Sequence, residues 1–421
     1  MPHAPLRLAL VASSALLAGC AWVHSSEDPL AVPGDEACSP GSLLHGADDP
    51  VRPTAADPDA QFPWDQEHPT VAQGFAADDH LFVLGGDPGG GIPSLDQPCF
   101  EPVGGGGDWL EPASPVLAIE HRGEARAYPL AILHFHEIVN DVVGGEPVAI
   151  TYCPLCNSGL AFERTDGDTI LEFGASDRLY RSNLVMYDRQ TRNLWLQFTG
   201  QAIAGEPFVG STLTRLPTAI VSWQRFGEDF PDGWVLTRET GFQRDYDVNP
   251  YVGYRSAALP DGVEFDQNEL GRESGLGAKS RVIGLHDPDS GDAVAIPLDD
   301  LAEARTSRVE LGRRAVVVLW APEMADALDG VTVDEGRDIG QTGAFVPALS
   351  LGDSKLRLTL EPDPDDDQLF LDAETGSSWT VLGRAVAGPL EGERLPVAAR
   401  DDTMWFVWLS FHPNTMVHNP P

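Results

Sequence analysis

The chain has few basic residues for its length. Of its 421 residues, 27 are Lys or Arg and 65 are Asp or Glu, which leaves a formal net charge of -38. A surface this acidic repels polyanions over most of its area, so nucleic acid is not expected as a partner. The acidity is typical of a well-solvated surface, including one adapted to high salt.

Cysteine is also scarce, with 5 in the whole chain. This count excludes a small disulfide-stapled scaffold, and the length is ample for the core of two or three domains. Cys153 and Cys156 form a C-x-x-C pair, but the sequence has no second C-x-x-C and no H-x-x-x-H to complete a structural zinc site.

The N-terminus has the features of a bacterial lipoprotein signal. It reads "MPHAPLRLALVASSALLAGC", with one Arg, an apolar run from Leu8 to Leu17 and a Leu-Ala-Gly-Cys box. The run is too short for a stable membrane-spanning helix. We therefore predict that residues 1–19 are removed and that Cys20 carries a lipid that holds the protein on the extracytoplasmic side of the cell envelope. In a Gram-negative cell the default location is the outer membrane.

Two segments of low regularity follow the signal. Residues 20–75 are rich in Pro, Asp, Ala and Gly and predict a flexible tether, and residues 76–115 predict a Gly/Pro-rich lead-in. Cys38 and Cys99 lie in such sequence. In an extracytoplasmic setting a loop-stapling disulfide is the plain explanation for them.

From Val116 onward short apolar runs alternate with turn residues. Gly-Gly, Arg-Gly and Asp-Gly pairs separate runs such as "GGEPVAITY" and "GLAFERTDGDTILEF", which is typical of β-hairpins. The fold class predicted is therefore mainly β (a β-rich α+β fold) with a few short helices.

The same motif occurs twice in this region. D-x-x-T-x-x-x-W followed by G-x-A-[IV]-A-G begins at Asp188 and again at Asp372. We infer two tandem, pseudo-symmetric β repeats, 116–250 and 281–421, joined by a connector, 251–280. The residues shared by both copies are Asp188, Thr191, Trp195, Gly200 and Gly205 in the first and Asp372, Thr375, Trp379, Gly383 and Gly388 in the second.

The Cys and His residues belong to the first copy only. The sequence alignment puts Trp320 and Glu323 opposite Cys153 and Cys156, and Ala302 and Ala304 opposite His134 and His136. A residue needed only to hold the fold should tend to appear in both copies. The asymmetry therefore marks the Cys/His set as the candidate site.

The stretch "TYCPLC" looks like the active-site entry of a glutaredoxin, but no helix is expected after it. The residues that follow predict a hairpin around Asp166-Gly167-Asp168. Without a helix N-terminus to lower the thiol pKa, a thioredoxin-like fold is not expected. Three alternatives remain for Cys153 and Cys156: a redox dithiol, half of a metal site or a structural disulfide.

A metal site would take its remaining ligands from "LHFHEIVND". His134 and His136 are two residues apart, so on an extended segment both point to one side, whereas on a helix they would diverge by roughly 200°. Two thiolates with one or two imidazoles suit copper or zinc, and thiolate softness favours copper. The predicted metal ligands are Cys153, Cys156, His136 and His134.

A redox site would use partly the same residues. Its predicted catalytic residues are Cys153, Cys156, His136 and Glu137. Further polar residues nearby, which we expect to support either site through hydrogen bonds, are Asn140, Asp141 and Tyr152.

These residues carry a family resemblance. "AYPLAIL", "HEIVND", "TYCPLCNSGLAFER", "LYRSNLVMYDRQTRNLWLQ", "GQAIAG", "TGSSW", "AVAGPL" and "FHPNT" occur in this order, and with them the chain resembles the bacterial and archaeal domain-of-unknown-function family DUF3179. The family pattern has Ser-Gly where this chain has Ser176-Asp177. Its matching site elements contain His136, Glu137, Asn140, Asp141, Tyr152, Cys153 and Cys156. The family has no assigned reaction, so the resemblance implies none.

The sequence thus predicts an envelope lipoprotein with a C-x-x-C/His site that binds copper or zinc or performs thiol redox chemistry. The alternative is a non-enzymatic extracytoplasmic binding module, in which the C-x-x-C is a permanent disulfide and a groove between the repeats holds a ligand or partner.

The anchor is tested by Cys20→Ser. Because the lipid would be attached to the Cys20 sulfur, the variant should leave the membrane fraction and keep its signal peptide or be mis-processed. Fractionation with mass spectrometry of the N-terminus measures this. Membrane retention of unlipidated protein would contradict the prediction.

Overall fold

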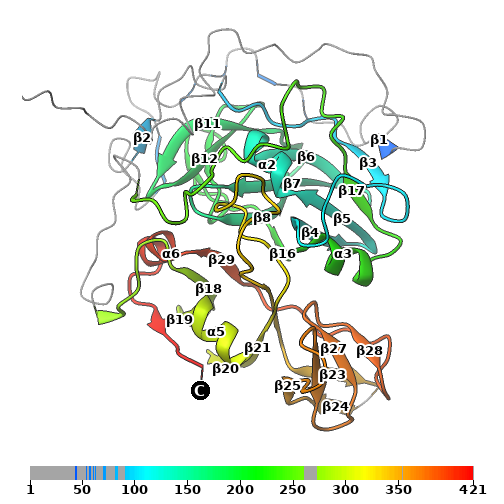
Figure 1. The fold of residues 1–421 in the computed structure, drawn as a ribbon. Helices are drawn as coiled ribbons and strands as arrows, with labels where there is room; N and C mark the ends of the chain where they lie inside the picture. Colours follow the sequence, from blue (N-terminus) through cyan, green and yellow to red (C-terminus); the bar gives the residue numbers. More distant parts are fainter. Residues whose placement is uncertain are drawn as a thin grey trace, which may run out of the picture.

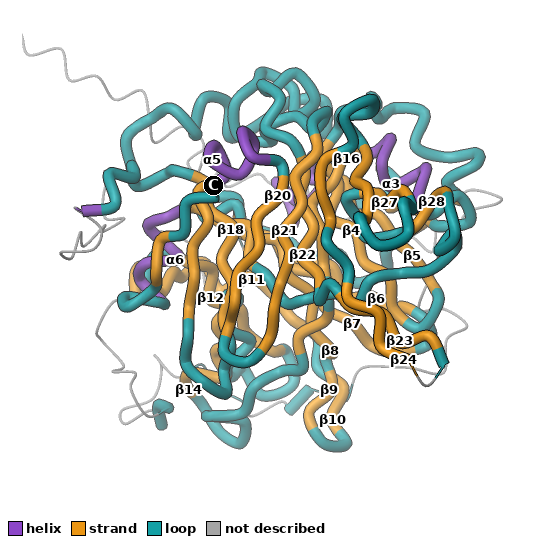
Figure 2. Tube along the Cα trace, turned by 90° about the horizontal axis from the view of Figure 1, so that it is seen from below, coloured by secondary structure: helices purple, strands orange, loops and turns teal. Residues whose placement is uncertain are grey.

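The computed structural model describes residues 91–259, 273–352 and 354–420, together with residues 54, 56–57, 60, 62 and 70–72 and two short strands, β1 (Leu43–Leu44) and β2 (Leu81–Val83). The protein is mainly β, as the sequence predicts, and Figure 2 shows strands throughout with only short helices. We call the described residues up to 259 the first half and residues 273–420 the second half; they lie one above the other in Figure 1.

The strands of the first half are β3 (Cys99–Pro102), β4 (Pro115–His121), β5 (Glu124–Pro129), β6 (Ile138–Val143), β7 (Glu146–Cys153), β8 (Ser158–Glu163), β9 (Thr165–Asp166), β10 (Thr169–Ile170), β11 (Phe173–Tyr180), β12 (Asn183–Asp188), β13 (Leu194–Leu196), β14 (Ala202–Ala204), β15 (Arg215–Leu216), β16 (Thr218–Ser222) and β17 (Trp234–Leu236). They form sheets of order β1-β3-β17-β5-β4-β16, β14-β13-β12-β11-β2 and β15-β8-β7-β6, and the two-stranded hairpin β10-β9. This hairpin is the one predicted around Asp166-Gly167-Asp168.

The strands of the second half are β18 (Arg281–His286), β19 (Ala293–Pro297), β20 (Thr306–Leu311), β21 (Arg314–Ala321), β22 (Gln341–Phe345), β23 (Ala348–Leu351), β24 (Ser354–Arg357), β25 (Leu360–Pro362), β26 (Leu369–Asp372), β27 (Ser378–Thr380), β28 (Ala385–Ala387), β29 (Asp401–Met404) and β30 (Met416–Val417). Their sheets have the orders β29-β18-β19-β30, β20-β21-β22, β23-β24 and β25-β26-β27-β28.

The helices of the described residues span seven residues each: α2 (Leu130–His136), α3 (Trp223–Asp229), α5 (Leu298–Ala304) and α6 (Trp405–Phe411). None of them is long and apolar enough to cross a membrane. The two helices α2 and α5 occupy the same place in their halves, since each connects a hairpin to the next pair of strands. Each follows a Pro at its N-cap and ends at a left-handed residue, Glu137 (φ 56) or Arg305 (φ 61).

One hydrogen bond recurs at these helix ends and sets the register of the strand behind them. The carbonyl oxygen of Glu137 accepts from the Tyr152 N–H at 2.7 Å, and that of Arg305 accepts from the Trp320 N–H at 2.8 Å. Tyr152 therefore corresponds to Trp320, and the sequence alignment, which put Cys153 there, was wrong by one residue. In the structure Cys153 corresponds to Ala321, whereas Cys156 has no counterpart, because β7 turns at once into β8 while residues 322–340 separate β21 from β22.

The shared Asp/Thr/Trp motif forms the same contacts in both halves. The indole N–H of Trp195 donates to Asp188 at 2.9 Å, and that of Trp379 donates to Asp372 at 2.9 Å. In each case the carboxylate also accepts a hydrogen bond from the backbone N–H of the Thr three residues later, Thr191 or Thr375. Both indoles are fully buried, so the motif is architectural: it ties a tight turn to the core.

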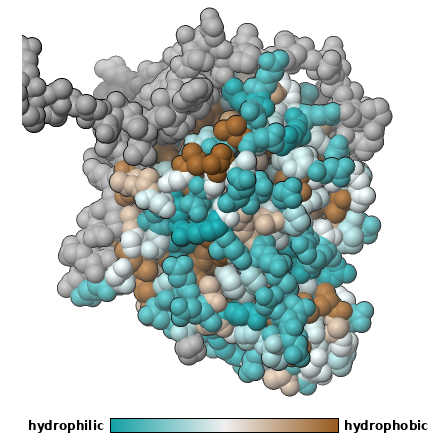
Figure 3. Space-filling view, in the orientation of Figure 1, coloured by the Kyte–Doolittle hydropathy of each residue, from teal (hydrophilic) through white to brown (hydrophobic). Residues whose placement is uncertain are grey.

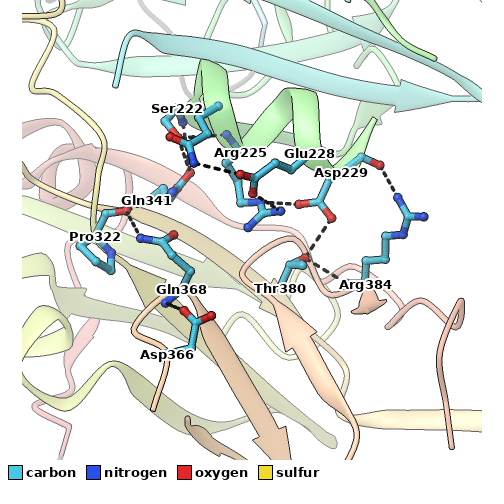
Figure 4. A network of polar contacts seen from close by, with 11 residues as sticks. Ser222, Arg225, Glu228, Asp229, Pro322, Gln341, Asp366, Gln368, Thr380 and Arg384 are labelled. Carbon is cyan, nitrogen blue, oxygen red and sulfur yellow. Dashed lines mark hydrogen bonds and ion pairs between the residues drawn. The ribbon is translucent and has the colours of Figure 1, made fainter. Parts of the chain in front are cut away.

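The halves meet along packed strands and a polar network. β8 lies against β29 and β16 against β22, and Figure 4 shows the network beside α3. Asp229, at the end of α3, pairs with Arg225 at 2.7 Å and accepts from the Thr380 hydroxyl at 3.1 Å. Arg384 donates to the Asp229 carbonyl oxygen at 2.6 Å. Side chains of the second half thus hold the end of a first-half helix.

Parts of the expected tether and lead-in belong to the first half. β3, from the predicted lead-in, pairs with β17 in the six-stranded sheet. Phe62 is 6% exposed and packs with Leu194 and Leu196, and the Thr70 carbonyl oxygen accepts from Gly205. Burial of an aromatic side chain and main-chain pairing keep these residues on the domain.

Cys99 is disulfide-bonded, as predicted. Its predicted partner Cys38, and Cys20, the predicted lipidation site, lie outside the described residues. The face in Figure 3 is mostly hydrophilic with small apolar groups, in agreement with the acidic composition.

The Trp residues of the motif test the architecture. A buried Trp truncated to Ala should cost about 3 to 5 kcal/mol of unfolding free energy, so Trp195→Ala and Trp379→Ala should both fold poorly or unfold at lower denaturant. Half-buried Trp109 provides the control, because Trp109→Ala should cost less. A wild-type denaturant midpoint for Trp195→Ala would contradict the assignment.

Candidate functional site

The two cysteines of the C-x-x-C lie in a tight turn between two strands. Cys153 ends β7, the Cys156 N–H donates to the Cys153 carbonyl oxygen at 3.1 Å, and Asn157 takes a left-handed conformation (φ 50) before β8 begins. The turn points both side chains the same way. Their sulfurs are 2.7 Å apart, and both residues are free cysteines.

This turn is buried between the halves. Cys153 is 2% exposed and Cys156 is 0% exposed. The Cys156 Sγ lies 3.1 Å from the Ser182 carbonyl oxygen. On the other side, the Cys156 carbonyl oxygen accepts from the Met404 N–H and the Thr403 hydroxyl, both at 3.0 Å. The second half therefore forms one wall of a site whose sulfurs come from the first half.

A buried carboxyl group stands next to Cys153. Glu137 is 7% exposed, and no hydrogen bond reaches its carboxyl group within the described part of the chain. Burial raises the pKa of Glu137 well above its usual range, and the negative charges of Cys153 and Asp177 raise it further. Burial also raises the pKa of the Cys153 thiol, with further increases from the hydrogen bond and charge of Cys156. Burial therefore disfavours the charged form of both the thiol and the carboxyl group.

Asp177 takes the place of the glycine in the family pattern. It keeps the backbone that glycine favours, with φ 56, inside an irregular stretch of β11. Gly91 lies so close that a Cβ there would be 2.6 Å from a carboxylate oxygen of Asp177. The substitution therefore brings an additional carboxylate into the surroundings of Glu137.

The two histidines lie on α2 and not on an extended segment, which would have pointed both side chains to one side. On a helix, side chains two residues apart diverge. His136 Nδ1 is 2.8 Å from the Pro93 carbonyl oxygen and Nε2 is 2.7 Å from the Tyr246 hydroxyl. Burial lowers the pKa of His136 to about 4. With both nitrogens occupied, His136 is a neutral hydrogen-bonding residue of the core.

His134 is buried without polar contacts. It is 3% exposed, and neither ring nitrogen has a hydrogen-bond partner among the described residues. Its ring lies 5.7 Å from that of Tyr152 and 5.1 Å from that of Tyr251. Burial lowers the pKa of His134 to about 3.

The predicted metal ligands are thus divided between two faces of β7. Tyr152 and Cys153 are neighbours on this strand and point to opposite faces. The sulfurs belong to one hydrophobic cluster, while Tyr152 belongs to another together with Tyr246, the partner of His136. Among the described residues no group of three or more His, Cys, Asp or Glu side chains could hold a metal ion. The structure gathers Cys153, Cys156 and Glu137 only; metal binding stays a prediction.

The polar residues expected to support the site hold the fold instead. The Asn140 side chain pairs with the backbone N–H and carbonyl of Phe173, both at 2.8 Å. Asp141 accepts from Arg126 at 2.6 Å. The Tyr152 hydroxyl accepts from the Asn157 side-chain amide at 3.1 Å, behind the cysteine turn.

One contact was missed at the sequence level. The Tyr254 hydroxyl donates to the Leu155 carbonyl oxygen at 3.1 Å, so the predicted connector covers the cysteine turn. Its composition suggested only a link, although the aromatic residues of "NPYVGYRS" were a signal for a packed segment.

The histidines predict an acid-dependent stability. The pKa of His134 falls from 6.5 to about 3 on folding, so its contribution is fully present above about pH 6.5 and is lost as pH falls toward 3. His134→Leu should keep near wild-type stability at pH 7 and lose less between pH 6 and pH 4. Urea unfolding across this range measures it, and an unchanged slope would contradict it. As a control, His136→Leu removes the hydrogen bonds to the Pro93 carbonyl oxygen and the Tyr246 hydroxyl and should cost about 1 to 3 kcal/mol at pH 7.

Comparison with known proteins identifies the family of the chain, and the description of that family names no reaction. The family model described as "Protein of unknown function (DUF3179)" matches residues 89–415, which include the cysteine turn, Glu137 and both halves. No curated protein and no solved structure matches the chain. Because the match covers most of the sequence, the chain belongs to the DUF3179 family.

Proposed function

We propose that Cys153 and Cys156 form a thiol–disulfide redox centre in which Glu137 exchanges protons with Cys153. The observation that carries this proposal is the grouping of two free thiols, 2.7 Å apart, beside a buried carboxyl group with a raised pKa. A disulfide bond measures about 2.05 Å, so its formation requires only a small movement of the sulfurs.

The raised pKa values explain why a proton acceptor is needed. The thiolate is the nucleophile in disulfide exchange, but burial keeps Cys153 protonated. A carboxylate whose pKa is raised toward that of a thiol is a better base for it than an ordinary Glu. Since Cys153 raises the pKa of Glu137 through its charge, ionisation of one disfavours ionisation of the other, and a proton can pass between them.

Oxidation of the centre would proceed through a mixed disulfide with an external disulfide, R–S–S–R. With Glu137 in its carboxylate form, Cys153 gives its proton to Glu137, its thiolate attacks one sulfur of R–S–S–R, and the first R–S⁻ leaves and takes that proton from Glu137. The Cys156 sulfur then attacks the Cys153 sulfur, and the Cys156 proton passes to the second R–S⁻, which leaves as R–SH. Two electrons and two protons thus pass to the external disulfide, and the reverse sequence reduces an oxidised substrate.

Comparison with the second half supports the assignment of these side chains to a functional site. In the second half the positions equivalent to Glu137 and Cys153 hold Arg305 and Ala321, while the hydrogen bond that fixes the helix end is the same. The backbone of the helix end and of the strand therefore does not require these two side chains.

Burial of both sulfurs favours a second candidate, the binding module with a permanent disulfide. Buried cysteines in apolar surroundings are often inert. The two candidate functions predict different reduction potentials for the Cys153–Cys156 disulfide, because structural disulfides resist reduction down to about -300 mV or below. In either case we propose that the protein is held in the cell envelope by the lipid on Cys20.

Redox titration of the purified full chain in thiol–disulfide buffers tests the proposal. The disulfide between Cys153 and Cys156 should form and break in one reversible two-electron transition. Alkylation of the free thiols and mass spectrometry measure its extent. Glu137→Gln should slow exchange at pH 7 by about 100-fold or more, because it removes the proton acceptor. Arg305→Gln, at the equivalent position of the second half, is the matched control and should react at the wild-type rate.

Two results would decide against the redox centre. A disulfide that stays closed at about -300 mV would support the binding module. One equivalent of copper or zinc in the wild type, absent from Cys153→Ser, would support the metal site instead. If Glu137→Gln performs thiol–disulfide exchange at the wild-type rate, Glu137 has no part in the mechanism.

A further inference from the structure

A cavity of about 160 Å³ lies between the two halves. It is lined by β4 and β16 of the first half and by β22 and residues 382–400 of the second half. Val397, which belongs to the lining, is 54% exposed, so the cavity is open to solvent on that side. An engineered apolar cavity of about 150 Å³ is known to bind benzene, so a space of this size can hold one aromatic ring.

The walls of the cavity are joined across the two halves. Phe230 lines it directly after Asp229, which accepts from the Thr380 hydroxyl at 3.1 Å (Figure 4). The Asp229 carbonyl oxygen accepts from Arg384 at 2.6 Å, and β16 packs against β22. A cavity with walls fixed in this way is formed before a ligand arrives. Its large apolar lining residues include Ile119, Phe230, Phe345, Leu382 and Leu395.

Three charged residues line this apolar space, and two of them are positive. Glu120 and Arg394 form an ion pair at 2.6 Å, and both side chains are exposed. An exposed pair of this kind contributes little to stability, so Arg394 can exchange Glu120 for another carboxylate. The third residue is Arg400, so the lining has a net positive charge in a chain whose net charge is -38.

Arg400 is a buried cation without an ion pair among the described residues. It is 8% exposed, and its Nη2 donates to the Thr342 carbonyl oxygen at 2.5 Å. The carboxylates that follow it in sequence have other partners: Asp401 pairs with Arg215 at 2.9 Å, and Asp402 accepts from Arg281 at 3.0 Å. Burial lowers the pKa of Arg400, because its charged form is poorly solvated there. A bound anion would stabilise this charge.

We infer that the cavity binds a small organic carboxylate whose apolar body is about the size of one aromatic ring. The body fills the space between β4, β16 and β22, and the carboxylate pairs with Arg400 and with Arg394 in place of Glu120. A planar guanidinium suits the two oxygens of a carboxylate. The inference does not depend on the redox centre, because no residue of the cysteine turn lines this cavity.

Three probes test the charge and the apolar body separately on the full chain. Sodium benzoate has both, benzyl alcohol has the ring without the charge, and sodium acetate has the charge without the ring. At constant ionic strength benzoate should bind saturably by calorimetry and raise the thermal midpoint. Benzyl alcohol and acetate should each bind at least about tenfold more weakly, because each lacks one of the two contributions.

Two variants separate the same contributions in the protein. Arg400→Gln should weaken benzoate binding by about tenfold or more, because it removes the buried positive charge. Ala219→Leu keeps every charge and adds apolar volume to the lining, so it should weaken benzoate and benzyl alcohol alike. Arg357→Gln, at an exposed arginine of β24, is the matched control for the loss of charge and should bind benzoate as wild type does.

Circular dichroism shows whether each variant is folded, and Ala219→Leu decides alone if Arg400→Gln does not fold. The inference fails if benzoate does not bind saturably, or if it binds no more tightly than acetate and benzyl alcohol. It also fails if Ala219→Leu and a folded Arg400→Gln both bind benzoate with wild-type affinity.

Discussion

The candidate site depends on the hydrogen bonds that the Cys156 carbonyl oxygen accepts from the second half. This oxygen accepts hydrogen bonds from Met404 and Thr403, so a strand of the second half is fixed to the turn that carries the sulfurs of the first. The hydrophobic cluster around the cysteines also includes Trp405 and Val282 from the second half. Neither half alone would bury the sulfurs, and the raised pKa values follow from this joint burial.

Burial acts in opposite directions on the acids and bases of this region. It raises the pKa of Glu137 and Cys153 and lowers the pKa of His134 and His136, because the neutral form is favoured in each case. The surroundings of the cysteine turn therefore favour uncharged side chains. Arg281, which is buried nearby, keeps its charge because arginine does not give up its proton.

The sequence predicted the elements whose cause is local. Alternating apolar runs predicted the β class, and Asp166-Gly167-Asp168 predicted its hairpin because turn residues act over a few positions. The helix that carries His134 was missed, since seven residues are too short to display a helical period and "LAILHFH" is apolar throughout. The one-residue error opposite Cys153 arose because a hydrogen bond between Glu137 and Tyr152, distant in sequence, sets the register.

The ion pairs between distant segments were out of reach for a different reason. Arg255 and Asp326 come from separate segments, and their residue types carry no signal of which charges meet. By contrast, Cys153 and Cys156 were identified because the second copy lacks them. A comparison within one chain can therefore substitute for a comparison between proteins, but only for residues that one copy lacks.

The left-handed residue at the end of α2 has a consequence for protein engineering. Glu137 and Arg305 adopt nearly the same backbone angles, and the bond that each helix end requires comes from its carbonyl oxygen, which every amino acid has. The side chain at this position is therefore free to vary without loss of the turn. The second half keeps this helix end but not the cysteine turn, because residues 322–340 separate β21 from β22. A designer would therefore need to rebuild that loop, as well as change side chains, to obtain a duplicate centre there.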